Sequence, residues 1–393
     1  MIFKIINKTG LLILVLVLTG CSKTLTPKSI VVFGDSLSDQ GNLLAIFSYA
    51  PYFQNIHMTT PPSSHNGRAF TNKLLAVEYL AKHYKIDLSP AWNYKKSNTD
   101  IQASIHKNKS YANTVAAIVS NSNFQEMDKN SDLRKEAEFL IETLLDKVHS
   151  TTLDGNNYAI ANTTIASDYD GFFNMLFNAL SLPHQIAKYK KHGDKSDIEK
   201  TLFVIMTGGN DIFNITLDQS LSVYDKKVAV SNLIPIIVNS IHELQILGAK
   251  KILIPGLPDI GNAPAFYNKP FEQLISELSK HFNEELSKSI HQNFSKKQVK
   301  WLPIEPWLSN LENNWKPSQL KHKACVSDIS NQYIDWKKLF IQQELDVKFV
   351  GNCTQQALDN GEYFYYDSVH GTNAVYEKLG KLLIQTTSKF FSQ

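Results

Sequence analysis

Short apolar runs alternate with longer amphipathic segments along most of this chain. Four runs have the length and continuous hydrophobicity of buried strands: 30–33, 158–161, 202–206 and 251–255. Five segments show helical spacing of apolar positions: 73–83, 172–190, 226–247, 271–294 and 374–391. Such alternation predicts an α/β fold, a three-layer sandwich in which helices flank a mainly parallel central sheet.

Three of the predicted strands end in short polar loops. Gly34-Asp35-Ser36 follows the first, Asn162 follows the second, and Gly208-Gly209-Asn210 follows the third. Ligands of open α/β sheets bind beyond the carboxyl ends of the strands, so Ser36, Asn162 and Asn210 are expected to face one crevice. Each loop taken alone also has the composition of an ordinary turn.

A candidate catalytic set comes from the two ends of the chain. A serine hydroxyl is a poor nucleophile, so it needs a hydrogen-bonded base, and the base needs a partner that fixes its tautomer. Ser36, His370 and Asp367 can fill these three roles. The side-chain amide of Asn210 can donate a hydrogen bond to an oxyanion.

A second Asp-x-x-His, at 146–149, has a different context. It lies within the polar helical pattern 134–149, which is typical of a solvated helix face. Asp367 instead follows an aromatic run and precedes Gly371-Thr372, which places it on a loop at a strand end. We therefore favour His370 over His149 as the base.

These motifs, in this order, resemble those of the GDSL lipolytic enzymes of the SGNH hydrolase superfamily. The matching blocks are 34–39, 67–72, 77–80, 208–211, 254–261 and 367–370, and the resemblance spans 30–391. It implies the SGNH hydrolase fold and an acyl intermediate on Ser36, formed with His370 as base and Asp367 as its partner. It implies no metal and no organic cofactor, and the sequence contains no zinc-protease, phosphate-loop or Gly-x-Ser-x-Gly motif.

The chain departs from this family in one block. Where relatives have Asn-Tyr-Ala-x-Gly-Gly, it has Asn-Tyr-Ala-Ile-Ala-Asn at 157–162. The family's donor there is a backbone N–H, which any residue except proline provides, and asparagine tolerates positive φ. The resemblance thus implies an oxyanion hole made by the Ser36 N–H, the Asn162 N–H and the Asn210 side chain. The N–H of Ala161 is an alternative donor.

The N-terminus has the pattern of an export signal. Lys4 and Lys8 precede an apolar run at 11–18, which is too short to span a bilayer. Residues 18–21 resemble the bacterial lipobox, which implies a signal peptide at 1–20, a lipid on Cys21, a tether at 21–28 and a hydrolase domain at 29–393. Ser22 resembles the pattern of outer-membrane lipoproteins. The alternative is an ordinary signal peptide and a secreted enzyme.

The two remaining cysteines are Cys325 and Cys353. In an exported protein a disulfide between them is expected, with two free thiols as the alternative. A loop of this size gives a chain-entropy stabilisation of roughly 3.5 kcal/mol. Polar stretches at 92–131 and 315–361 are interpreted as insertions, and either can form a lid.

Composition and resemblance together limit the classes of partner that we expect. A formal net charge of +3 on 393 residues gives no reason to expect a nucleic-acid partner. The resemblance is strongest to the larger bacterial GDSL phospholipases, lysophospholipases and glycerophospholipid:cholesterol acyltransferases. It implies a phospholipid or lysophospholipid substrate at a membrane surface, with acyl transfer to an alcohol such as a sterol as a further reaction. The alternatives are a carboxylesterase acting on short-chain or carbohydrate esters, and a lipid-binding lipoprotein with decayed catalysis.

Overall fold

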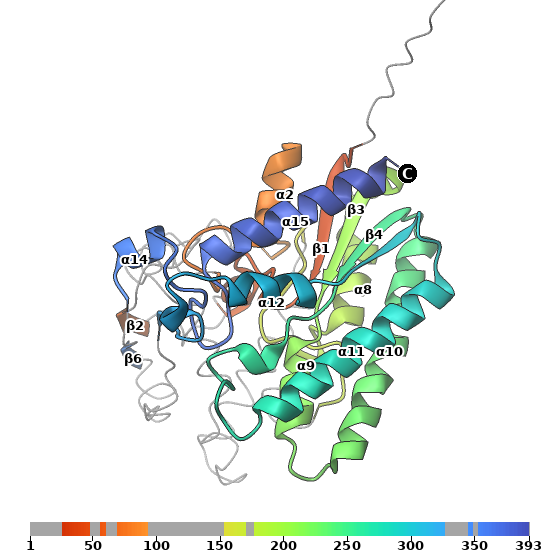
Figure 1. Cartoon of the computed structure of the whole chain (residues 1–393). Helices are drawn as coiled ribbons and strands as arrows, with labels where there is room; N and C mark the ends of the chain where they lie inside the picture. The colour runs from red at the N-terminus through yellow and green to blue at the C-terminus, as the bar shows by residue number, and fades with distance from the viewer. Residues whose placement is uncertain are drawn as a thin grey trace, which may run out of the picture.

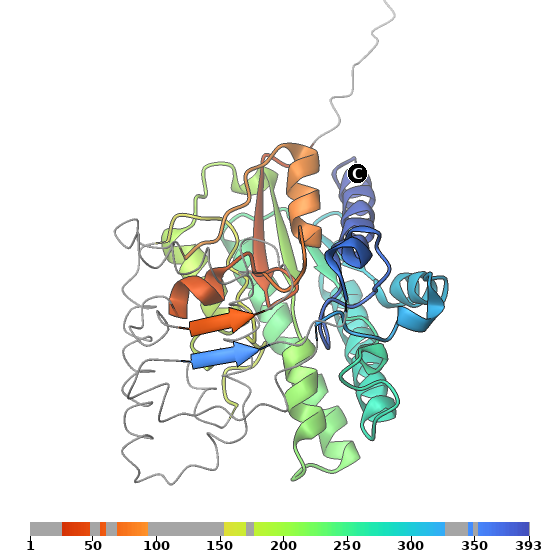
Figure 2. The ribbon, with the colours of Figure 1, turned by 90° about the vertical axis from the view of Figure 1, so that its left-hand side faces the viewer.

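The computed structural model describes residues 26–47, 56–59, 69–92, 153–169, 177–326, 345–348 and 353–392. Within these ranges a parallel sheet has the strand order β1-β3-β4-β5 (Figure 1). Its strands are β1 Ser29–Gly34, β3 Thr201–Met206, β4 Lys251–Pro255 and β5 Val299–Leu302. A separate parallel pair, β2 Ile56–Thr59 and β6 Leu345–Lys348, lies side by side in Figure 2.

The continuous hydrophobicity of β1 and β3 reflects burial on both faces of the sheet. Val31 and Phe33 point into one core cluster, and Ile30 and Val32 point into the other. All six residues of β3 are buried. Strands of this kind are covered by helices on both sides, and their sequences are therefore apolar without alternation.

Helices form the two outer layers. The first core cluster joins the sheet to α8 Leu182–His192, α10 Val223–Ile246 and α11 Glu272–Asn293. The second joins its opposite face to α2 Ala76–Tyr84, α12 Glu305–Asn313 and α15 Asn373–Phe391 (Figure 1). The predicted three-layer α/β sandwich is confirmed.

Shorter helices connect these layers. They are α1 Asn42–Phe47, α9 Gly209–Leu217, α14 Gln355–Asp359, and the 3-10 turns η3 Ile198–Lys200, η4 Ile260–Asn262 and η5 Ser318–Leu320. The described residues contain no helix long and apolar enough to cross a membrane. Several predicted features lie outside the described residues: the predicted signal peptide at 1–20, Cys21, the polar helical pattern at 134–149, almost all of the predicted insertion at 92–131, and 327–344 and 349–352 of that at 315–361.

The strand predicted at 158–161 is wrong. This segment runs beside β1 and donates hydrogen bonds from Tyr158 N to Val32 O at 2.7 Å and from Ile160 N to Gly34 O at 3.0 Å, but only Asn157 forms a bridge. On its other side the side-chain amide of Asn42 binds the carbonyls of Asn157 and Ala159 at 2.8 and 2.7 Å. The backbone of 89–91 forms a bridge there with Asn157 alone, and beyond it the Asn42 amide stands in for a strand, so no ladder forms.

The predicted helix at 172–190 is not continuous: residues 177 and 178 are helical, and α8 begins only after a break. A turn at 179–181 precedes α8, which starts at Leu182 with Pro183 in its first turn. Proline fits the first turn of a helix but removes a hydrogen bond from a helix interior, so it begins a new helix here. Residues 170–176 lie outside the described part. The other four predicted helices are present as α2, α10, α11 and α15, with ends shifted by one to three residues.

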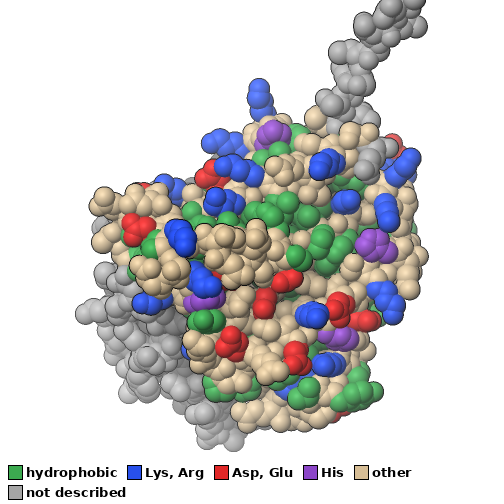
Figure 3. Space-filling model, viewed as in Figure 1, with side chains coloured by type: hydrophobic (Ala, Val, Ile, Leu, Met, Phe, Trp, Pro, Cys, Tyr) green, Lys and Arg blue, Asp and Glu red, His purple; other side chains and the backbone are tan. Residues whose placement is uncertain are grey.

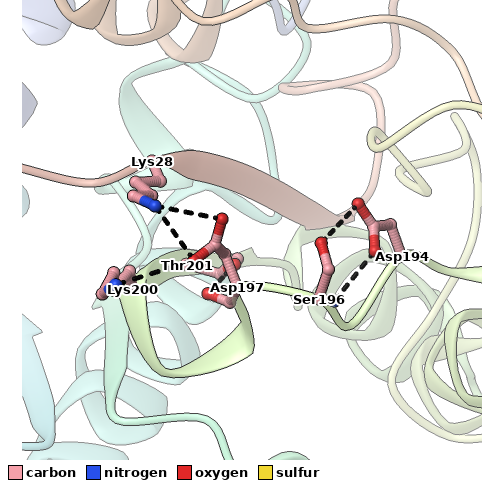
Figure 4. A network of polar contacts seen from close by, with 6 residues as sticks. All are labelled: Lys28, Asp194, Ser196, Asp197, Lys200 and Thr201. Carbon is pink, nitrogen blue, oxygen red and sulfur yellow. Dashed lines mark hydrogen bonds and ion pairs between the residues drawn. The ribbon is translucent and has the colours of Figure 1, made fainter.

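The amino ends of the strands lie at the edge of the sheet where the described chain begins. Lys28 donates its N–H to Lys200 O at 3.0 Å, and its ammonium lies 3.2 Å from Asp197 (Figure 4). The end of α15 closes the same edge, because Lys251 at the start of β4 donates to Phe390 O at 2.7 Å. Ser36 follows the opposite end of β1, about 20 Å away at roughly 3.3 Å per strand residue.

We predict that Gly34 tolerates no side chain. Its φ is +148°, and an added Cβ would lie 1.9 Å from Met206 O in the neighbouring strand. Gly34→Ala should lower the free energy of unfolding by more than about 3 kcal/mol, measured by denaturant titration. Gly209→Ala is the matched control, because its added Cβ meets nothing closer than Asp35 Oδ2 at 4.0 Å and should change stability by less than about 1 kcal/mol. Equal losses in the two variants would contradict this account.

Candidate active site

The turn after β1 raises Ser36 out of the sheet. Gly34 allows the sharp exit, and Asp35 donates its N–H to Met206 O at 3.3 Å. The Asp35 carboxylate accepts the N–H of Leu37 at 3.1 Å, and the Asp35 carbonyl accepts that of Ser38 at 3.1 Å. These bonds hold the turn closed and leave Ser36 half-buried at its tip.

Ser36, His370 and Asp367 form one chain of hydrogen bonds. His370 Nε2 lies 2.7 Å from Ser36 Oγ, although the two residues are 334 positions apart in sequence. His370 Nδ1 lies 2.8 Å from both carboxylate oxygens of Asp367. With Nδ1–H donating to the carboxylate, Nε2 is left to accept the serine proton, which is the arrangement a general base needs.

The surroundings of His370 fix the ring. Asp367 Oδ1 accepts the backbone N–H groups of Val369 and His370 at 2.9 and 2.8 Å, so the carboxylate and the histidine belong to one tight turn. The Phe70 ring packs with its centroid 4.8 Å from that of His370. Both Asp367 and His370 are 8% exposed, which shields their hydrogen bond from water. Phe70 lies in the 67–72 block, for which the motif analysis gave no function.

The segment before Asp367 is tied to the disulfide. Cys325 and Cys353 are bonded, so this prediction is confirmed. Cys325 N donates to Tyr365 O at 3.2 Å, and Val326 N donates to Tyr366 O at 2.8 Å. The bridge therefore anchors the chain that pairs with the residues leading into Asp367. The stretch 315–361, interpreted above as an insertion that can form a lid, is described only at 315–326, 345–348 and 353–361, so its lid role stays a prediction.

The segments that carry the three predicted oxyanion donors meet at Thr163: Ser36 and Asn162 lie on loops, and Asn210 lies in the first turn of α9. Asn162 has φ +64°, and Asn210 Nδ2 donates one hydrogen to Thr163 O at 2.8 Å, which leaves the other hydrogen of that amide. Within the described part of the chain, the backbone N–H groups of Ser36 and Asn162 have no acceptor. Unused donors of this kind are what an oxyanion hole requires.

The alternative donor, Ala161, is already occupied. Its N–H donates to Asp39 Oδ2 at 2.8 Å. Asp39 is fully buried and also accepts the N–H groups of Gly41, Asn42 and Leu43 at the start of α1. The geometry thus favours Asn162 over Ala161 as the second backbone donor.

A second buried carboxylate holds the far side of the same loop. Asp211 accepts the N–H groups of Ile165 and Ala166 at 2.9 and 3.2 Å and the hydroxyl of Tyr169 at 2.9 Å. Burial raises the pKa of Asp211 to about 7 and that of Asp39 to about 6, and the N–H donors oppose that rise. The motif analysis placed both aspartates in matching blocks but gave them no role, because their partners come from a distant segment.

Among the described residues, no group of three or more His, Cys, Asp or Glu side chains could hold a metal ion. The arrangement itself consists of a serine hydroxyl, a histidine, a carboxylate and free N–H donors. This set suits acyl transfer, in which the serine attacks a carbonyl and the donors bind the oxygen that gains charge. The catalytic and oxyanion roles of the individual residues stay predictions.

Comparisons with known proteins agree with this chemistry. Residues 30–383 match the family model described as GDSL-like Lipase/Acylhydrolase. A GDSL esterase/lipase of Arabidopsis thaliana is 30% identical over 143 residues, which are 32% of this chain and 40% of the plant protein. The chain thus spans less than half the length of that relative. Because the family model covers most of the sequence, the chain belongs to the GDSL-like lipase/acylhydrolase family.

Proposed function

We propose that the protein cleaves acyl esters of phospholipids or lysophospholipids through an acyl-serine intermediate. The observation that carries the proposal is the hydrogen-bonded chain from Ser36 through His370 to Asp367. Family membership supports ester hydrolysis in general. The finer substrate class is supported by the resemblance of the motif spacing to large bacterial phospholipases.

The proposed steps use the hydrogen-bonded groups described above. Ser36 Oγ attacks the ester carbonyl carbon while His370 Nε2 accepts its proton and Asp367 stabilises the imidazolium. The carbonyl oxygen gains charge and binds the N–H groups of Ser36 and Asn162 and the side chain of Asn210. Collapse breaks the ester bond, and His370 protonates the leaving alcohol.

The second half of the reaction releases the acyl group. Water gives its proton to His370 and attacks the acyl carbon, which yields the fatty acid and free Ser36. An alcohol such as a sterol in place of water gives a new ester, and we propose this transfer as a secondary reaction. Neither half-reaction requires a group other than these side chains and backbone donors.

We further propose that the protein is exported and carries lipid on Cys21, as an outer-membrane lipoprotein. Lys28 lies at the amino edge of the sheet (Figure 4), whereas Ser36 follows the carboxyl end of β1. The face in Figure 3 carries both cationic and acidic side chains, and the membrane attachment we propose is the lipid on Cys21.

The substrate class is tested by comparing lysophosphatidylcholine with a short soluble ester. Wild-type protein should turn over the lysophospholipid with the higher kcat/KM. Ser36→Ala should lower kcat at least about 10⁴-fold on both substrates, because it removes the nucleophile.

Adding phospholipid with and without sterol reports acyl transfer in the lipid products. Negligible lysophospholipid turnover beside rapid short-ester cleavage would favour a carboxylesterase. No fluorophosphonate adduct on Ser36 in folded protein would favour a binding protein.

The oxyanion donors are tested by paired substitutions. Asn210→Ala should lower kcat by about 10²- to 10³-fold, because it removes a donor to the developing charge. Asn162→Gly should keep kcat within about threefold of wild type, because the backbone N–H remains and glycine adopts positive φ freely. A loss in Asn162→Gly as large as that in Asn210→Ala would show that the Asn162 side chain, and not its N–H, acts on the reaction.

Lipid attachment is tested by expressing the full chain in a bacterium supplied with labelled palmitate. Wild-type protein should incorporate label and fractionate with membranes. Cys21→Ala should lose both properties, because it removes the thiol that accepts the lipid, whereas Ser22→Ala should keep the label. Label that persists in Cys21→Ala would contradict the proposal, and an unlabelled wild-type protein in the medium would indicate an ordinary signal peptide.

A further inference from the structure

The backbone donors at Ser36 and Asn162 come from separate segments of the chain, and a side chain from a third segment joins them. Gln185 lies on α8 and is 1% exposed. Its carbonyl oxygen accepts the Gly34 N–H at 2.9 Å, and its amide nitrogen lies 2.9 Å from Gly34 O and 3.1 Å from Thr163 Oγ1. A single carboxamide therefore contacts both the turn that carries Ser36 and the loop that carries Asn162.

The sheet leaves this position for Gln185 to fill. β1 pairs with β3 on one side, and on its other side it meets only the irregular segment that ends at Ile160. Gly34 O already accepts the N–H of Ile160 at 3.0 Å, and no strand covers the Gly34 N–H. The Gln185 carboxamide binds both backbone groups of Gly34, as a neighbouring strand would do.

The contacts also determine the orientation of the amide. The amide nitrogen faces three acceptors, because Leu180 O lies 3.1 Å away in addition to Gly34 O and Thr163 Oγ1. The oxygen faces a backbone N–H, which is a donor only. A flipped amide would place oxygen against carbonyl oxygens, so the amide has a single orientation.

Thr163 extends the connection to the third donor. Thr163 directly follows Asn162, and its carbonyl accepts Asn210 Nδ2 at 2.8 Å. Its hydroxyl also lies 3.1 Å from Gly34 O. Gln185 and Thr163 together link the segments of all three proposed oxyanion donors.

We propose that Gln185 is a positioning residue that sets the spacing of the oxyanion donors. The inference rests on the proposed ester hydrolysis at Ser36 and goes beyond it. Donors stabilise an oxyanion when they lie about 2.7–3.1 Å from it, and a misplacement of about 1 Å can cost about 10²-fold in rate. Loss of the bridging amide frees the Ser36 turn to move relative to the Asn162 loop.

A merely structural role for Gln185 predicts something different. In that case its loss would lower stability but leave kcat unchanged in the protein that remains folded. Tyr189→Phe is the matched control. Tyr189 lies one turn further along α8 and is 1% exposed, and the substitution removes only its hydroxyl hydrogen bond to Asp194 O at 3.1 Å. This bond does not touch the Ser36 turn or the Asn162 loop.

The experiment compares Gln185→Met and Gln185→Glu with wild type and Tyr189→Phe. For each we would measure the free energy of unfolding, kcat and KM on a soluble p-nitrophenyl ester, and binding of an alkyl boronic acid, whose tetrahedral adduct on Ser36 places an oxygen in the hole. The Gln185 variants should lose about 10- to 100-fold in kcat and in boronic acid affinity, with KM within about twofold. Tyr189→Phe should keep both values.

A second pair of variants keeps the test valid if the Gln185 variants do not fold. Thr163→Val removes the hydroxyl partner of Gln185 and should lower kcat and boronic acid affinity together. Thr163→Ser retains the hydroxyl and should restore both to within about threefold of wild type. Wild-type kcat in any folded Gln185 variant, or in Thr163→Val, overturns the positioning role. Wild-type protein that neither cleaves the ester nor binds the boronic acid would instead contradict the proposed hydrolase.

Discussion

The close approach of β1 to β3 at Gly34 is the constraint on which the rest of the site depends. An added Cβ on Gly34 would lie 1.9 Å from Met206 O, so the neighbouring strand leaves no room for a side chain there. The same Met206 carbonyl accepts the Asp35 N–H and thereby starts the turn that presents Ser36. The pairing of β1 with β3 and the turn that exposes Ser36 both depend on this contact at Gly34. A side chain at position 34 would disturb both, which explains why glycine is needed at that position.

Buried carboxylates hold the loops around this turn at an energetic cost. Asp35, Asp39 and Asp211 are almost completely buried, and burial raises the pKa of each to between about 6 and about 7. Removing a carboxylate from water is unfavourable unless several donors surround it. Asp39 is surrounded by four backbone N–H groups: two from α1, one from Gly41 just before α1, and one from Ala161 in the Asn162 loop. We infer that the hydrogen bonds to these buried carboxylates hold the loops in one geometry. Hydrogen bonds exposed to water would restrict the loops less.

Sequence patterns predicted those features that depend on residues close together in the chain, such as buried strands and amphipathic helices. Apolar runs located β1, β3 and β4. The loops after the predicted strands were expected to meet, and Thr163, next to Asn162, contacts both Gly34 O and Asn210. The prediction at 158–161 was wrong because an apolar run does not show what its backbone groups bind. Here the Asn42 side chain binds the carbonyls of Asn157 and Ala159 that a neighbouring strand would otherwise bind. Gln185 could not be recognised, because in an amphipathic helix a buried glutamine leaves no periodic signal, and its partners at Gly34 and Thr163 are distant in sequence.

The asparagine at position 162 is the point where this chain departs from the sequence pattern of its family, and the structure explains how the departure can be accommodated. The loop is held through backbone groups on both sides of that residue, by Asp39 at Ala161 and by Asp211 at Ile165 and Ala166. Asn162 itself takes a left-handed φ of +64°, which asparagine adopts at lower cost than most residues. The direction of its N–H is therefore set by its neighbours and its φ, and not by the identity of its side chain. Glycine can adopt this left-handed φ, and so can an asparagine whose neighbours are held by hydrogen bonds.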